Sequence, residues 1–175
     1  MIDEPKLLNV LLYVLGKLDH AEREFHKVFK ILWFADIAHI KEYGRLITDD
    51  DYMKMEYGPV PSFLYDLLKG IRNHNPVFDK YRQDISVSGY KVDPLKAADM
   101  DYLSPSDVNA LDKSIKENRH LSMGVLTDKS HGQAWKKSAD SQKIYMESIL
   151  DEVGMSGQDR ELALESYAFS RHFSR

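Results

Sequence analysis

The stretch EFHKVFKILWFADIAHIKEY, residues 24–43, decides the architecture of this 175-residue chain. Its large apolar side chains cover most of the circumference of a helix, which predicts a helix that runs through the core and not along the surface. Gly44 is expected to end this helix, with Lys41 favourably placed in its last turn. The apolar positions are Phe25, Val28, Phe29, Leu32, Trp33, Ile37 and Ile40.

The segments around this helix predict another helix before it and a small antiparallel sheet after it. Leucines at helical spacing predict a helix over residues 5–18. Residues 52–57 alternate large and polar side chains, which indicates a strand. The proline-rich residues 58–62 predict a rigid turn into a helix that starts near Pro61 and ends at Gly70.

The second half of the chain predicts short strands followed by helices. Residues 85–92 alternate around a glycine and indicate one or two strands, and residues 100–103 are interpreted as another. Ser104-Pro105-Ser106-Asp107 is typical of a capped helix start. We expect an α+β fold, predominantly helical, with helices around a small antiparallel β-sheet. Residues 1–137 form the predicted domain, and residues 138–175 a C-terminal helical extension that packs on this domain or on a partner.

Composition limits the class of protein. The chain is 43% hydrophobic and 30% charged, which fits one compact soluble domain. It has no cysteine, which excludes thiol catalysis, thiolate zinc sites and disulfides. Together with the lack of a signal-peptide pattern at residues 1–6, this predicts a cytoplasmic protein. The longest apolar run, residues 10–15, is far shorter than the roughly 20 residues of a membrane-spanning helix, so no membrane association is expected.

Two groups of polar residues are candidates for chemistry, and each has a structural alternative. Asp36 and His39 lie one turn apart on the predicted core helix, as either a hydrogen-bonded internal pair or a catalytic pair, of which we favour the first. Residues 49–51 are three aspartates, but they lack the spacing of a calcium loop, and capping of a helix start explains them. No nucleotide, acyl-transfer or metal motif is present, so neither a cofactor nor a metal is expected.

The net charge of −4 gives no overall attraction to nucleic acid. A local basic cluster exists around residues 69–82, but aspartates dilute it, and a solvated loop is the favoured interpretation. Nucleic acid is therefore an unlikely partner. The cluster consists of Lys69, Arg72, Lys80 and Arg82.

Three blocks of sequence, in order, resemble the Panacea domain of SocA-like antitoxins, a family with phage-associated members. Residues 29–36, with His39 and residues 43–45, are similar to its K-L-L-Y-F-A-D…H…Y-G-R pattern. Residues 53–62 are similar to its M-x-Y-G-P-V-P-S block. Residues 102–104 and 126–135 match its L-S and L-x-x-x-S-H…A-W elements. Trp33 stands where the family often has tyrosine, and Gly132-Gln133 where a proline is common.

The resemblance covers roughly residues 7–137 and implies a cytoplasmic bacterial antitoxin of a toxin–antitoxin pair. Such a protein is not an enzyme; it neutralises a cognate toxin by direct protein–protein binding. One family member also delivers its toxin to a Clp protease, which makes a Clp-type protease a second possible partner. The oligomeric state and the identity of the toxin stay open.

The polar and proline residues of the matching blocks are the candidate site. They are expected either to bind the partner or to form an internal polar network, and residues 138–175 are expected to make partner-specific contacts. Two alternatives are a nucleic-acid-binding regulator of its own operon and a hydrolase that uses Asp36, His39 and His131. The candidate site residues are Asp36, His39, Tyr57, Pro59, Pro61 and His131.

Overall fold

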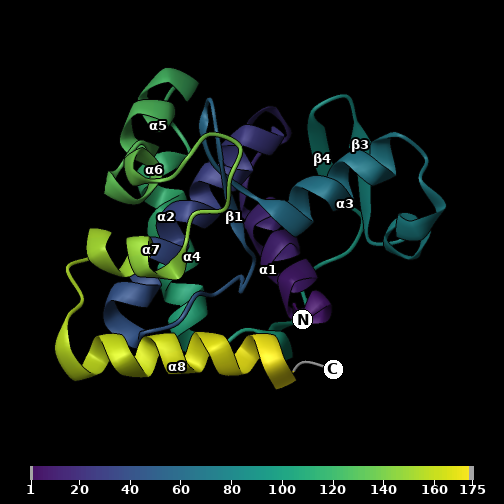
Figure 1. The fold of residues 1–175 in the computed structure, drawn as a ribbon. Helices are drawn as coiled ribbons and strands as arrows, with labels where there is room; N and C mark the ends of the chain where they lie inside the picture. The colour runs from purple at the N-terminus through teal and green to yellow at the C-terminus, as the bar shows by residue number, and fades with distance from the viewer. Residues whose placement is uncertain (1, 174–175) are drawn as a thin grey trace.

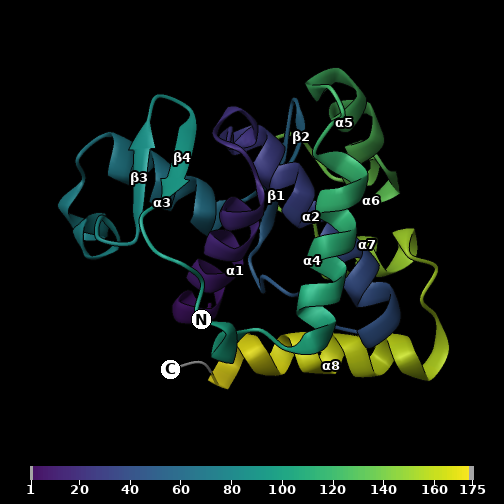
Figure 2. The same ribbon diagram turned by 180° about the vertical axis from the view of Figure 1, so that it is seen from behind.

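The computed structural model describes residues 2–173, with the side chains of residues 2–171. Helix α2 (Phe25–Tyr43) lies at its centre, beside α1, α4 and the hairpin β1–β2 (Figures 1 and 2). Most residues of α2 are buried, and Gly44 ends the helix in the left-handed conformation at φ 69°, so the predicted core helix is confirmed. The surrounding elements are α1 (Glu4–Lys17), β1 (Tyr52–Met55), β2 (Gly58–Pro61) and α4 (Pro105–Asn118).

Two groups of elements flank this centre on opposite sides (Figure 1). One contains α3 (Ser62–Arg72), β3 (Ile85–Ser88) and β4 (Lys91–Pro94), and the other contains α5 (Met123–Ser130), α6 (Gln133–Lys137) and α7 (Met146–Glu152). Helix α8 (Gly157–Phe173) runs across one end of the molecule. The predominantly helical α+β fold is confirmed, with its strands arranged as two separate antiparallel hairpins, β1–β2 and β3–β4. Within residues 2–173, no helix has the length and apolarity needed to cross a bilayer.

The buried apolar side chains form two clusters, and α2 contributes to both. Phe25, Phe29 and Leu32 pack into the first cluster, with α1, α3, α4 and the β3–β4 hairpin. Trp33 and Ile40 face the second cluster, which lies against β1, α6, α7 and α8. This double role explains why apolar residues surround the helix on all sides.

The chain after residue 137 completes the second cluster. Its backbone joins β1, because Lys54 N–H donates to the Gln142 carbonyl at 2.8 Å and Ile144 N–H donates to the Tyr52 carbonyl at 2.7 Å. Residues 141–171 thus pack on their own chain, while the predicted domain boundary at residue 137 stays a prediction. This segment contributes the cluster residues Ile144, Met146, Ile149, Leu150 and Ala163.

Residues 58–61 form a strand, so the predicted turn at this place is wrong. The backbone groups of Tyr52 and Lys54 point away from β2 and bond residues 141–144. Pro61 and Pro59 lie opposite these two residues, so the backbone N–H that each proline lacks is not needed for pairing with β1. The alternation of an antiparallel ladder therefore lets two prolines sit in a paired strand. The turn itself is at residues 56–57.

Two further sequence predictions are wrong in detail. Helix α3 continues through Gly70 to Arg72, and the ring of Phe78 occupies the space where a side chain at Gly70 would lie. Gly70 is thus needed for close packing and does not end the helix. Residues 100–102 form a 3₁₀ turn capped by Asp99, not a strand.

Two helical glycines provide a matched test of this packing. Gly16 in α1 has open space around it, so Gly16→Ala is expected to raise the free energy of unfolding by up to about 1 kcal/mol. Gly70→Ala is expected to lower it by about 1–3 kcal/mol, because the new methyl group collides with the Phe78 ring. Urea unfolding of both variants measures the difference, and a stabilised Gly70→Ala variant would contradict the packing argument.

Candidate functional site

Asp36, in the middle of α2, is a fully buried carboxylate that accepts four hydrogen bonds. Its Oδ1 accepts from the backbone N–H groups of Ile47 at 2.6 Å and Thr48 at 3.1 Å. Its Oδ2 accepts from the Thr48 hydroxyl at 2.5 Å and the Tyr52 hydroxyl at 2.7 Å. Burial raises the pKa of Asp36, and these donors offset part of that rise. The carboxylate therefore ties α2 to the following loop and to strand β1.

The three aspartates that follow in the loop bind two different elements. The Asp50 carboxylate accepts from the N–H groups of Phe63 at 3.0 Å and Leu64 at 3.1 Å, so it caps the start of α3. Asp51 accepts from the Tyr167 hydroxyl of α8 at 2.9 Å. Capping therefore explains Asp50 but not Asp51, and the capped helix is α3, not one that starts at these aspartates. Among the described residues, no group of His, Asp and Glu forms a potential metal site.

Asp51 also pairs with two cations, Lys143 at 2.9 Å and Arg171 at 2.8 Å. The first comes from the segment beside β1 and the second from α8. The loop thus anchors the C-terminal segment by charge as well as by packing.

His39 belongs to a second internal network, which joins α2 to the start of α4. Its Nδ1 donates to the Arg45 carbonyl at 2.9 Å, and its Nε2 lies 3.0 Å from the Ser106 hydroxyl. Burial lowers the pKa of His39, so the neutral ring accepts from Ser106. The nearby Asp107 carboxylate pairs with Arg45 at 2.8 Å and with Lys6 at 3.2 Å.

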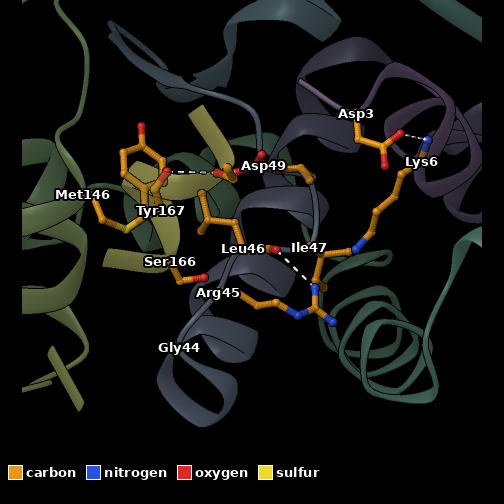
Figure 3. Close-up of a pocket in the computed structure, with 12 residues that line it drawn as sticks. Asp3, Lys6, Gly44, Arg45, Leu46, Ile47, Asp49, Met146, Ser166 and Tyr167 are labelled. Carbon is orange, nitrogen blue, oxygen red and sulfur yellow. Dashed lines mark hydrogen bonds between the residues drawn. The ribbon is translucent and has the colours of Figure 1, made fainter. Parts of the chain in front are cut away.

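These two cations line a pocket of about 260 Å³ between α1, the loop after α2, and α8 (Figure 3). Figure 3 shows Lys6 and Arg45 pointing toward one another along one wall. Burial alone would raise the pKa of Asp107, but hydrogen bonds from Ser104 and the charges of Lys6 and Arg45 lower it overall. Lys6 and Arg45 thus both pair with the buried Asp107 carboxylate and belong to the internal network.

Lys30 is a fully buried lysine beneath the β1–β2 hairpin. Its ammonium donates to the Pro59 carbonyl at 3.1 Å, and no carboxylate among the described residues pairs with it. Burial lowers the pKa of Lys30 to about 8. A side chain at Gly58 would collide with Lys30 and with the Ser130 hydroxyl, and Gly58 has φ 104°, so this position requires glycine.

His131, at the end of α5, stacks on Trp135 with ring centroids 3.7 Å apart. The Trp135 indole N–H donates to the Met55 carbonyl at 3.0 Å, so this stack supports the end of strand β1. Burial, and then the charge of Lys30, lowers the pKa of His131. The hairpin is therefore fixed by Lys30 on one strand and by Trp135 on the other.

The predicted site residues thus fall into three places. Asp36 and His39 bond different partners in two internal networks, so they do not form the predicted hydrogen-bonded pair. His131 supports the hairpin, and Pro59 is bonded to Lys30. Pro61 is buried in β2. Tyr57, at the tip of the hairpin, is 58% exposed. Partner binding by these residues stays a prediction.

The hydrolase alternative needs three side chains in one open pocket. Asp36 contacts Thr48 and Tyr52, His39 contacts Arg45 and Ser106, and His131 stacks on Trp135. Asp36 is fully buried. The structure does not bring the three together around a substrate-sized space, so this alternative lacks the geometry it requires.

The basic cluster that the nucleic-acid alternative requires is largely engaged within the chain. Lys80 pairs with Glu4 at 2.7 Å, and Arg82 pairs with Asp79 at 2.7 Å. Arg72 lies over the ring of Tyr90. These contacts reduce the free positive charge that a phosphate backbone would meet.

Comparison with models of known protein families identifies the family of this chain. A model of the family described as antitoxin SocA-like, Panacea domain, matches residues 28–136, more than half of the chain. The chain belongs to the SocA-like Panacea family. Searches of the curated proteins and of the solved structures found no match.

Two functional candidates within this Panacea domain were missed by sequence reasoning. Lys30 is a charged residue inside the apolar run Phe29–Trp33, and this was the available signal for a buried charge. Asp107 was recognised as a capping residue only, and its pairing with Lys6 and Arg45 depends on long-range contacts that local sequence does not show.

The buried lysine of the Panacea domain predicts a specific pH dependence of stability. Its pKa is about 8 in the folded chain and 10.5 as its ordinary value. Between these values the unfolded chain binds more protons, so the free energy of unfolding rises with pH in this range. Lys30→Met is expected to remove that rise.

Urea unfolding of wild type and Lys30→Met at several pH values measures this difference directly. The histidines whose pKa the Lys30 charge lowers titrate below this pH range, so the comparison isolates the lysine. Parallel stability curves for the two proteins between pH 8 and 10.5 would show that the ammonium is not held in a buried site.

Proposed function

We propose that this chain is an antitoxin that neutralises a cognate toxin by binding it directly, without a catalytic step. The observation that carries the proposal is the Panacea match over residues 28–136. The internal networks support it, because the polar residues that resembled a catalytic set hold the fold together. A rigid scaffold with a few exposed aromatic side chains is what a protein-binding module needs.

We propose that the toxin-binding face lies on the Panacea domain and not on the C-terminal segment. Residues 141–171 complete the second apolar cluster, where they cover Trp33 and Tyr52. A chain without them would expose these buried rings and lose stability. Deletion of this segment would therefore destabilise the fold, so a loss of toxin binding by the shortened chain would not identify the binding face.

Delivery of the bound toxin to a Clp-type protease is a further proposal, which rests on the family resemblance. A complex that only blocks the toxin leaves its half-life unchanged or longer. A complex that delivers the toxin shortens its half-life, and only in cells that contain the protease.

The proposal predicts the outcome of co-expression with the product of the neighbouring gene. We expect that protein to stop growth when expressed alone, and growth to return when this chain is co-expressed. The two proteins should co-purify as a complex. A control with an early stop codon in this chain separates the effect of the protein from that of its transcript.

Two results would contradict the antitoxin proposal. One is a neighbour that is harmless when expressed alone and does not bind this chain. The other is rescue that persists with the early stop codon, because the protein is then not the neutralising agent.

A further inference from the structure

The outer face of the β1–β2 hairpin forms one wall of an apolar pocket. In the hairpin, Met53 lies opposite Val60, and Met55 points to the same side as Met53 because strand residues alternate. These side chains enclose about 310 Å³ together with the first turns of α2 and α3. The residues that line this hairpin pocket are His26, Met53, Met55, Glu56, Tyr57, Val60, Ser62, Tyr65 and Asp66.

Exposed aromatic rings extend the hairpin pocket across the surface. Tyr57 is 58% exposed and Tyr90 is 60% exposed, and His26 contacts both rings at centroid distances of 6.4 Å. Methionine and tyrosine at one place suit protein binding, because methionine adapts its shape and tyrosine provides a large rigid contact.

The charged residues of the hairpin pocket indicate the charge of a partner that would fit it. Its charged lining residues are Glu56 and Asp66, both exposed, and among residues 2–171, whose side chains the structure describes, neither carboxylate forms an ion pair. Cations already lie over two rings of this face, Lys69 over Tyr65 and Arg72 over Tyr90. Tyr57 has no such cation among the described residues. The two carboxylates and the Tyr57 ring therefore complement a segment that brings its own positive charge.

We propose that the hairpin pocket binds a segment of the toxin that inserts an apolar side chain flanked by lysine or arginine. This inference rests on the proposed function and adds the binding face and the chemistry of the bound segment. The apolar side chain packs between the two methionines and Tyr65. The flanking cations meet Glu56, Asp66 and the open ring of Tyr57.

The hairpin is built to hold this pocket in place without the partner. Its inner side is fixed by the Lys30 ammonium on the Pro59 carbonyl and by the Trp135 indole on the Met55 carbonyl. A preformed site loses little conformational freedom on binding, which favours affinity.

Direct binding of labelled peptides to the full chain tests the pocket independently of the toxin. Three fluorescein-labelled probe peptides of equal length carry tryptophan between arginines, tryptophan between glutamates, and serine between arginines. We expect the first to bind at least about tenfold more tightly than the other two. Tyr57→Ala, and the pair Glu56→Lys with Asp66→Lys, should each weaken it about tenfold.

Matched controls lie on other surfaces of the chain. Tyr145 is 62% exposed beyond the hairpin pocket, and Glu117 is exposed on α4. Tyr145→Ala and Glu117→Lys repeat the two kinds of change and should alter peptide binding by less than about twofold. Equal binding of the three peptides, or equal effects of pocket and control variants, overturns the proposal.

The same variants in the growth-rescue experiment separate this inference from the proposed function. Wild-type rescue that is lost with the pocket variants and kept with the controls supports both. If all pocket variants keep wild-type rescue and toxin affinity, the pocket is not the binding face, and the antitoxin function is unaffected by that result. A wild-type chain that forms a dimer broken by Tyr57→Ala assigns the pocket to a second copy, which also overturns it.

Discussion

The buried carboxylate of Asp36 is the constraint on which the rest of the structure depends. A carboxylate without water or a cation is costly, so all of its lone pairs must be used. The four donors come from the loop at Ile47 and Thr48 and from Tyr52 at the start of β1. Meeting this requirement fixes the path of the chain from α2 into the hairpin. The next aspartates can then reach α3 and α8.

The hairpin connects this internal constraint to the surface. Its inner face carries Tyr52, which bonds Asp36, and its proline strand offers the carbonyl that Lys30 requires. Strand alternation leaves Met53 and Met55 on the other face, where they line the hairpin pocket. One short element therefore satisfies two buried charges and presents an apolar site bordered by carboxylates. The same few residues of the hairpin therefore stabilise the fold of this Panacea domain and form its proposed binding site.

Local sequence signals predict the helices that are determined by residues within the helix itself or at its ends. The apolar residues of α2, the capping box at Ser104 and the glycine at position 44 were sufficient for their helices. Features with a distant cause were not predictable in the same way. Pro59 and Pro61 fit in a strand only because residues 141–144 take the other edge of β1, and Gly70 is required by Phe78. The same holds for the site: Asp36 and His39 were candidates as polar residues in an apolar helix, but their partners lie in segments that sequence alone does not bring near.

A double-mutant cycle between Asp36 and Tyr52 tests this account most directly. Tyr52→Phe removes the donor and Asp36→Asn removes the charge of the acceptor, with little change in side-chain shape, and urea unfolding gives the free energies. We predict a coupling energy of at least about 1 kcal/mol, because the bond is fully buried. Tyr13 and Asp112, which form a similar 2.8 Å bond near the surface, should couple more weakly as the matched pair. Additive effects at Asp36 and Tyr52, within about 0.3 kcal/mol, would contradict the claim that this carboxylate joins α2 to the hairpin.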